Sequence, residues 1–375
     1  MLTISTMQML MNIWPDKKSH FMIIHRQSFA AFLLLAGCYM ANAHDFSATV
    51  NGQKIFFNIK SKINKTVEVT YGGNIHSKNV SVATGNLEIP AKVKHENVVY
   101  DVVSIGAKSF CGASELEGVV IPSTVRSIGA FAFEGCTSLS KVIFPGSEVT
   151  FGEGVFFKCS SIKDITFGSD WKTVDLSRFR WSDSLLTITI PARIEKIQGL
   201  KTLRFLKSVS VDVNNSRFLS FDGVLYSKDG KTLHGCPRSY DGSLKIKDGT
   251  EVISIDALID CPLITRIDFP ATIKTFSFRE TSRMRLLETI VFRGTTPLNT
   301  AYIGNEGKFL IQVANADVKV IVPSDSKRGY KSSLVKEGGE YMASNDSDST
   351  PYVVEADQLV KESNIIGAKN FSKYN

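Results

Sequence analysis

Cysteine and histidine, which most often bind metals or act as nucleophiles, are scattered through this sequence. The chain contains six cysteines and six histidines. No two cysteines have the C-x-x-C spacing of zinc and redox sites, and no two histidines have the H-x-x-x-H spacing of a helical metal pair. The sequence therefore predicts no catalytic residue, no metal site and no cofactor.

Two glycine-containing segments match nucleotide-binding motifs only in part. Gly230-Lys231-Thr232 has the last residues of a phosphate-binding loop, but Leu225 stands where that loop requires its first glycine. Gly152-Glu153-Gly154 begins like a dinucleotide-binding fingerprint, but Phe157 occupies the position of the third glycine. There is also no G-x-S-x-G nucleophile elbow. We expect no nucleotide site.

An internal repeat organises most of the chain. Its motif is Φ-x-x-Φ-x-Φ, where Φ is apolar and proline often follows, as in 116–122 and 139–145. From the copy that ends at Ile89 to the copy that ends at Val322, five of the nine steps are 23 residues long. One such repeat cannot bury its apolar face alone and must stack on its neighbours, so the sequence predicts a solenoid.

Each repeat supplies the parts of one coil. The last three residues of the motif are expected to form a short strand whose first and third side chains point inward. The proline ends the strand, because it has no N–H to donate. Glycine recurs at a tight corner and phenylalanine at an inward position: Gly106, Gly129, Gly152, Phe110, Phe133 and Phe156. We expect the three rings to stack as a phenylalanine ladder.

The spacing of these residues resembles the BspA-type (Treponema-type) leucine-rich repeat of bacterial surface proteins. The best copy runs from Val125 to Cys136 within the pattern I-P-x-x-V-x-x-I-G-x-x-A-F-x-x-C-x-x-L. Residues 45–71 resemble the N-terminal cap of secreted members from Bacteroides-like bacteria, residues 218–230 their hairpin insertion and residues 320–330 their closing strand. The resemblance implies a mainly β repeat solenoid. Residues 169–184 and 199–206 depart from the pattern, because they lack the Ala-Phe-x-x-Cys segment.

The predicted organisation has four parts. Residues 1–43 are an upstream segment and signal peptide, and residues 44–86 form the N-terminal β cap. Residues 87–335 form the solenoid, with the hairpin insertion near 212–240. Residues 336–375 are a linker and C-terminal tail; the polar run 344–351 suggests the linker, and 352–375 fits either a short strand and helix or a disordered end.

Residues 22–43 have the features of a secretory signal peptide. Arg26 precedes the apolar run 29–36, and a small-x-small site ends at Ala43, after which we expect cleavage and secretion or display at the cell surface. The alternative is a lipoprotein, because residues 35–38 resemble a lipobox in which Cys38 would carry the lipid. That lipid would be the only attachment to a membrane, since a membrane span needs about 20 apolar residues.

The charge of the chain argues against nucleic acid as a partner. The formal net charge is +7. It is spread along the whole chain, whereas nucleic-acid binding requires lysine and arginine to be gathered on one face. We expect no nucleic-acid partner.

The middle residue of each strand is expected to face solvent, and solenoids use such a face for binding. We call these seven positions the outward stripe: Val120, Ile143, Thr166, Thr189, Ser210, Asp268 and Val291. Two apolar neighbours, Val120 and Ile143, suggest a contact patch for a partner. The alternative is that β-branched residues are there because they favour strands.

Four cysteines lie at or near corresponding positions of the repeat, and Cys236 lies outside the repeat, beside Pro237. Cys136 and Cys159 are 23 residues apart, so stacked coils would bring them close together. We expect small buried side chains at Cys111, Cys136, Cys159 and Cys261, and a disulfide between Cys136 and Cys159 is the alternative.

The function expected from the sequence is non-enzymatic binding. The family resemblance implies adhesion to host matrix proteins, other cells or glycans through the sheet face of the solenoid. The first alternative is a structural or assembly module that docks to another protein of the cell's own envelope. The second is a β-helix enzyme acting on polysaccharides, which would gather carboxylates in a groove; the outward stripe contains a single acid, Asp268.

Overall fold

The fold is described from a computed structural model. It describes residues 44–72, 83–274, 284–296 and 318–327, and the backbone of 342–345, 348–353 and 365–368. The chain divides into two compact units. One comprises residues 1–44 and 72–80, and the other, whose fold follows, comprises residues 45–71 and 81–375. The predicted signal peptide, its end at Ala43 and the alternative lipid site at Cys38 lie outside the described residues.

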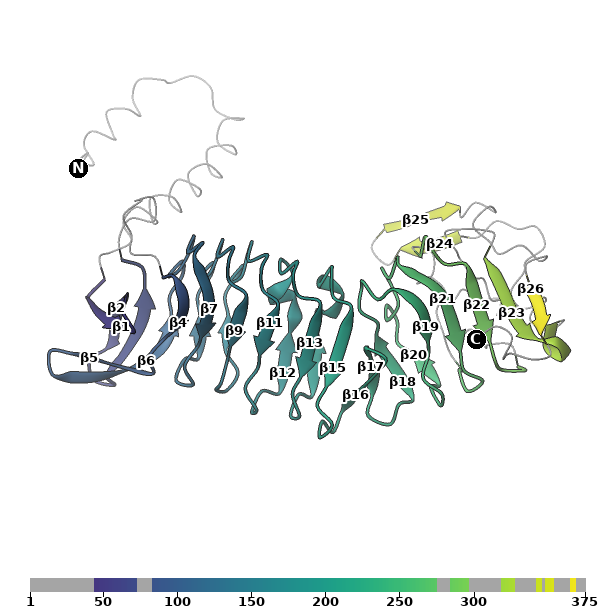
Figure 1. Cartoon of the computed structure of the whole chain (residues 1–375), viewed down its shortest axis with the longest axis horizontal. Coiled ribbons are helices and arrows are strands. Elements are labelled where there is room, and N and C mark those ends of the chain that lie inside the picture. The colour runs from purple at the N-terminus through teal and green to yellow at the C-terminus, as the bar shows by residue number, and fades with distance from the viewer. Residues whose placement is uncertain are drawn as a thin grey trace, which may run out of the picture. The chain divides into compact units, whose positions relative to one another are not determined.

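The second unit is a β-solenoid, as predicted, and Figure 1 shows the strands β7, β9, β11, β13 and β15 following one another in chain order. One parallel sheet has the strand order β11-β9-β7-β4. Val119 pairs with Val142 and Val142 with Ile165, so each coil advances the register by 23 residues. The four strands are β4 (Gly85–Glu88), β7 (Leu116–Val120), β9 (Lys141–Ile143) and β11 (Asp164–Thr166).

A second line of strands forms another side of the same coils. β6 (Val98–Ile105), β8 (Ser127–Ile128) and β10 (Thr150–Phe151) are parallel neighbours in one sheet. Gly129 and Gly152 follow this line, where a coil lies close to the backbone of its neighbour. A Cβ atom added at either glycine would lie 2.4 Å from the backbone nitrogen of Ala107 or Ala130, which confirms the predicted tight corner.

The two segments that lack the Ala-Phe-x-x-Cys pattern still complete their coils. Each contains a short 3₁₀ helix, η1 (Leu176–Phe179) and η2 (Leu200–Thr202). The flanking strands pair in parallel, β12 (Thr173–Asp175) with β14 (Lys196–Gln198) and β13 (Thr187–Ile190) with β15 (Ser208–Val211). The solenoid therefore continues through residues 169–206 despite the change in sequence.

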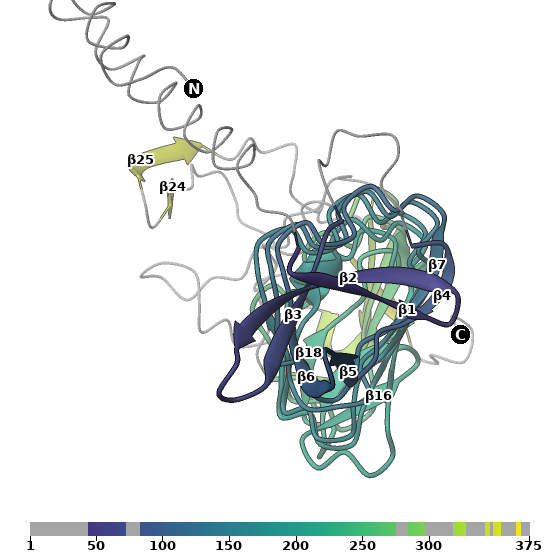
Figure 2. The same ribbon diagram turned by 90° about the vertical axis from the view of Figure 1, so that its left-hand side faces the viewer.

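The first coils are closed by the strands β1 (Phe46–Val50), β2 (Gln53–Ser61) and β3 (Thr66–Thr70). β1 to β3 are antiparallel, and β3 lies parallel to β6, so they cover the open edge of that sheet as expected. Figure 2, which looks along the stack from this end, shows β1 and β2 crossing the end of the coils. The short strand β5 (Lys92–His95) pairs antiparallel with β6.

The predicted hairpin insertion is present. β16 (Phe218–Phe221) and β17 (Val224–Ser227) pair antiparallel around Asp222 and Gly223, both of which have positive φ. β17 then pairs with β18 (Thr232–Gly235), and β18 pairs in parallel with β20 (Val252–Ile253). The insertion thus leaves the solenoid after β15, and its last strand, β18, pairs with β20 of the following coil.

The C-terminal coils form a sheet with the strand order β19-β21-β22-β23-β26. Its members are β19 (Gly242–Lys245), β21 (Ile264–Phe269), β22 (Thr289–Phe292), β23 (Lys319–Pro323) and β26 (Ile365–Ala368). Two expectations for the tail are wrong. β23 does not close the sheet, because β26 from the tail pairs with it in parallel. The polar run taken as a linker contributes to β24 (Met342–Asn345) and β25 (Asp348–Val353), which pair antiparallel. Asn, Asp and Ser favour hairpin connections as well as linkers, so composition alone could not separate the two.

The interior is filled by the repeated apolar positions. The predicted phenylalanine ladder is confirmed, with ring centroids 5.1 Å apart for Phe110–Phe133 and 5.5 Å apart for Phe133–Phe156. Phe179 of η1 extends it at 5.0 Å from Phe156. The buried side chains fall into two clusters, one from Phe46 to Val209 with Leu225 and one from Val224 to Val322.

Candidate functional site

The outward stripe is only partly open to solvent. Val120 and Ile143 are neighbours in register and half-buried, and Thr166 follows Ile143 and is exposed. Thr189 and Ser210 form an exposed pair on the next sheet. We call these five residues the open stripe.

The expectation that Asp268 and Val291 face solvent is wrong. Val291 is completely buried, and Asp268 is 6% exposed. The Asp268 carboxylate accepts hydrogen bonds from Arg293 at 2.8 Å and from Arg266 at 3.3 Å, as a buried charge requires.

The physical reason lies in the strands themselves. In β22, Ile290, Val291 and Phe292 are all buried, and β23 has the same pattern from Val320 to Val322. Continuous apolar runs are typical of parallel strands buried on both faces. The same kind of run at 119–121 and 142–144 leaves its middle residue half-buried, so the sequence alone did not distinguish the two cases.

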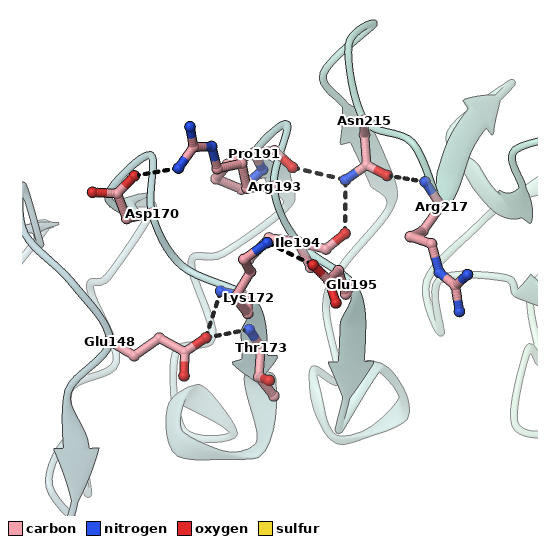
Figure 3. A network of polar contacts seen from close by, with 10 residues as sticks. All are labelled: Glu148, Asp170, Lys172, Thr173, Pro191, Arg193, Ile194, Glu195, Asn215 and Arg217. Atoms are coloured by element: carbon pink, nitrogen blue, oxygen red, sulfur yellow. Dashed lines mark hydrogen bonds and ion pairs between the residues drawn. The ribbon is translucent and has the colours of Figure 1, made fainter.

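A second feature, missed by the sequence analysis, is a ladder of polar contacts across neighbouring coils (Figure 3). Arg193 pairs with Asp170 at 2.9 Å, and Lys172 pairs with Glu195 at 2.6 Å. The Glu148 carboxylate accepts hydrogen bonds from the backbone N–H groups of Lys172 and Thr173. Both ion pairs join residues that are 23 positions apart, so applying the repeat period to charged residues would have predicted them.

Asn215 joins this ladder to the hairpin insertion. Its side chain is fully buried, and its Nδ2 donates to the carbonyl oxygens of Pro191 at 2.8 Å and Ile194 at 3.0 Å. Its Oδ1 accepts from the backbone N–H groups of Arg217 and Phe218, both at 2.8 Å. One amide thus fixes the start of β16 against the preceding coil.

Beside Asn215, the insertion and the coil enclose a hollow of about 430 Å³. We call this site the hollow; its lining residues are Glu195, Ser216, Arg217, Phe218, Ser227, Lys228, Asp229 and His234. It contains carboxylate, guanidinium, ammonium and hydroxyl groups next to one phenyl ring. Such convergent polar groups in a concave site are typical of small-molecule binding.

Titratable groups of the hollow are shifted by their neighbours. The pKa of Glu195 is lowered, first by the hydrogen bond from Lys172 and then by that residue's charge. The pKa of Asp229 is lowered by the hydrogen bond from the Ser227 hydroxyl and by the backbone N–H of Lys231. Burial lowers the pKa of His234, against a smaller opposite effect of Asp229, so the imidazole is neutral at neutral pH.

The five cysteines among the described residues are free thiols, including Cys136 and Cys159. The interpretation as small core residues holds for the buried ones, whereas Cys111 is only half-buried. A thiol pair that the sequence analysis did not single out lies between Cys236 and Cys261. The Lys201 ammonium lies 3.4 Å from Cys261 Sγ and donates to the Cys236 carbonyl oxygen at 2.8 Å. A hydrogen bond from Cys236 and the charge of Lys201 lower the pKa of Cys261 to about 7, and burial raises that of Cys236.

Within the described part of the chain, no three His, Cys, Asp or Glu side chains are grouped so that they could hold a metal ion. Among the same residues, no helix has the length and apolar character needed to cross a membrane.

Comparison with known proteins identifies the repeats. Residues 91–203 match a family model described as a BspA type leucine rich repeat region, in six copies. No curated protein matches the sequence.

Several solved structures are similar to the chain. A leucine-rich cell surface protein from Faecalibacterium prausnitzii is 20% identical, with 76% of this chain and 90% of that chain covered and a TM-score of 0.37. The pneumococcal vaccine antigen PcpA is 17% identical, with 78% and 97% covered and a TM-score of 0.37. A leucine-rich-repeat protein of T. pallidum is 18% identical, with 62% and 87% covered and a TM-score of 0.33.

Proposed function

Because this chain is a BspA-type leucine-rich-repeat protein, we propose that it is an exported, non-enzymatic adhesion protein that binds a protein partner through the open stripe. The proposal of secretion or surface display rests on the signal-peptide features of residues 22–43, with Cys38 as the alternative anchor. Host matrix proteins and proteins of other cells are the partners we propose.

The observation that carries the proposal is the contrast between two sets of strands. Val119-Val120-Ile121 and Val142-Ile143-Phe144 have the same apolar run as Ile290-Val291-Phe292. Val291 is completely buried, whereas Val120 and Ile143 remain half-buried. An apolar pair that is left partly open on an otherwise polar face marks a site for another molecule.

The shape of the open stripe also favours a protein over a small substrate. β7, β9 and β11 are parallel and in register, so their outward side chains form a flat surface of short β-branched residues. The one acid of the outward stripe, Asp268, is buried and paired with arginines rather than presented to a substrate. This arrangement argues against the carboxylate groove of a polysaccharide enzyme.

The test is binding of the full-length chain to an array of matrix glycoproteins and cell-surface proteins. The Val120→Lys/Ile143→Lys variant places two charges at the centre of the open stripe and should lose saturable binding. A matched control, Ser160→Lys/Ser184→Lys, adds the same charge on exposed positions of adjacent coils away from the sheet and should bind normally. Equal circular dichroism spectra would show that all variants are folded. A wild-type chain that binds nothing on the array would contradict adhesion and favour a partner from the cell's own envelope.

A further inference from the structure

The hollow lies where the hairpin insertion meets the preceding coil. Glu195 comes from the segment just before β14, whereas Arg217, Phe218, Ser227 and Asp229 come from the insertion. Insertions into a repeat scaffold often carry its binding site, because the scaffold holds them rigidly. Here the buried amide of Asn215 provides that rigidity.

The charges of the hollow are balanced. Glu195 and Asp229 are negative, Arg217 and Lys228 are positive, and the neutral His234 adds no charge.

Most of these groups already have a partner within the protein. Glu195 Oε1 accepts a hydrogen bond from Lys172, and Asp229 Oδ1 accepts one from Ser227 at 2.6 Å. Lys228 Nζ donates to the carbonyl oxygen of Val213 at 2.8 Å. What remains for a ligand is hydrogen-bonding capacity without a net charge.

That capacity comes from both donors and acceptors. Each carboxylate keeps a second oxygen, the Arg217 guanidinium presents its fork of N–H donors, and Ser216 contributes a hydroxyl group. An ionic ligand would meet one repelling group for every attracting one. A polyhydroxylated neutral ligand can use both kinds, because each hydroxyl donates one hydrogen bond and accepts others.

An aromatic wall completes the site. The Phe218 ring is half-buried, and its centroid lies 5.7 Å from that of His234 at an interplanar angle of 79°. The Nδ1 atom of His234 lies 3.4 Å from Ser254 Oγ, which orients the imidazole. A phenyl ring beside carboxylate and guanidinium groups matches a sugar ring, which has an apolar C–H face and a polar edge of hydroxyls.

We propose that the hollow binds a neutral saccharide, as a second site that neither includes nor requires the open stripe. Phe218 contacts the C–H face of the sugar ring. Arg217, Glu195 and Asp229 hydrogen bond with its hydroxyl groups.

The experiment measures binding of methyl glycosides of glucose, galactose, mannose and N-acetylglucosamine to the full-length chain, by saturation-transfer NMR and calorimetry. Glu195→Gln/Arg217→Gln removes two exposed groups of the hollow without touching Asn215 and should weaken binding of at least one glycoside about tenfold. Arg193→Gln, which changes an exposed arginine that pairs with Asp170 and does not line the hollow, should leave binding unchanged. Val120→Lys/Ile143→Lys should also leave it unchanged, which separates this site from the adhesion proposal.

Three results would overturn the proposal: no binding of any of the four glycosides, binding that Glu195→Gln/Arg217→Gln leaves unchanged, or stronger binding of glucuronic acid than of the neutral sugars. A Phe218→Ala variant checks the aromatic wall independently. With this variant, the C–H protons of the sugar ring should no longer give a saturation-transfer signal. An unchanged signal from these sugar protons would contradict the predicted contact with Phe218.

Discussion

At the scale of single residues, the glycines of the corner show how closely the coils are stacked. A Cβ atom at position 152 would lie 2.4 Å from the nitrogen of Ala130, 2.7 Å from the carbonyl carbon of Gly129 and 2.9 Å from the Cα atom of Ala130. All three atoms belong to the backbone of the neighbouring coil, which cannot move without disturbing the β8–β10 pairing.

We therefore expect Gly152→Ala to destabilise the protein by about 1–3 kcal/mol, which is the usual cost of forcing an extra carbon into a packed interior. The measurement is urea unfolding followed by circular dichroism. Gly294→Ala is the matched control, because its nearest contact is 3.3 Å and involves a carbonyl oxygen. Equal stability of Gly152→Ala and the wild type would contradict the close stacking.

Cys261 links stability to pH. Its pKa is lowered to about 7 in the folded chain by the hydrogen bond from Cys236 and by Lys201, and rises to that of an ordinary thiol on unfolding. A lowered folded-state pKa contributes stability above the unfolded-state value, and that contribution is lost as the pH falls through about 7.

In reducing buffer, Cys261→Ala should therefore cost more stability at pH 9 than at pH 6, by up to about 2 kcal/mol. Urea midpoints at the two pH values measure the difference. Lys201→Met in the wild-type background should reduce this pH dependence, because the Lys201 charge also lowers the pKa of Cys261, after the larger effect of the hydrogen bond from Cys236. A cost of Cys261→Ala that does not change with pH would show that Lys201 does not stabilise a thiolate.

Residue positions governed by the repeat were predictable, and those that depend on long-range contacts were not. The period of 23 gave the phenylalanine ladder and the glycine corner. It could not give the contact of Lys201 with Cys261, because the two residues are 60 positions apart and lie on either side of the insertion. Asn215 was missed as well, because a buried amide that bonds four backbone groups has no sequence signature.

At the scale of elements, the cap protects two different sheet edges in two ways. β3 pairs directly with β6. The first strand of the other sheet, β4, is protected by one side chain: Gln53 donates to the carbonyl oxygens of Thr84 at 2.8 Å and Asn86 at 3.2 Å and accepts from the N–H of Thr84 at 3.1 Å. The amide therefore bonds the edge as a neighbouring strand would.

Gln53→Ala should leave these backbone groups of β4 without their side-chain partner and lower the free energy of unfolding by about 1–2 kcal/mol. The variant should also form more soluble aggregates on warming, measured by light scattering. Gln198→Ala, an exposed glutamine in β14, serves as the control. The same midpoint for both variants would mean that Gln53 does not protect the edge.

Some strands could be predicted from the sequence and others could not. The strands of the regular coils, the cap and the Asp222-Gly223 hairpin all combine alternating apolar residues with turn residues, so their existence was predictable. The strand β26 was not, because its pairing with β23 joins segments far apart in the chain. The strands β24 and β25 form a local hairpin, but the polar composition of 344–351 suggested a linker. Burial of the outward residues in β22 and β23 was not predictable, because the same apolar run in β7 and β9 leaves Val120 and Ile143 half-buried.

At the scale of the whole second unit, the positions of the outward stripe are more exposed on the coils before the insertion than on the coils after it. The apolar core is divided into two clusters close to the insertion, with Leu225 in one and Val224 in the other. The open stripe lies on the first cluster, and the outward positions Asp268 and Val291 on the second are buried. The binding capacity that we propose is therefore concentrated on the coils before the insertion and at the insertion itself.

The central claim is that β7 and β9 present the binding surface through Val120 and Ile143. The most direct measurement is the ratio of dissociation constants of the wild type and Val120→Lys/Ile143→Lys for the same array partner, at equal folded content. The account predicts binding at least about tenfold weaker for the variant, with the Ser160→Lys/Ser184→Lys control unchanged. Equal dissociation constants for the wild type and the stripe variant would contradict the account.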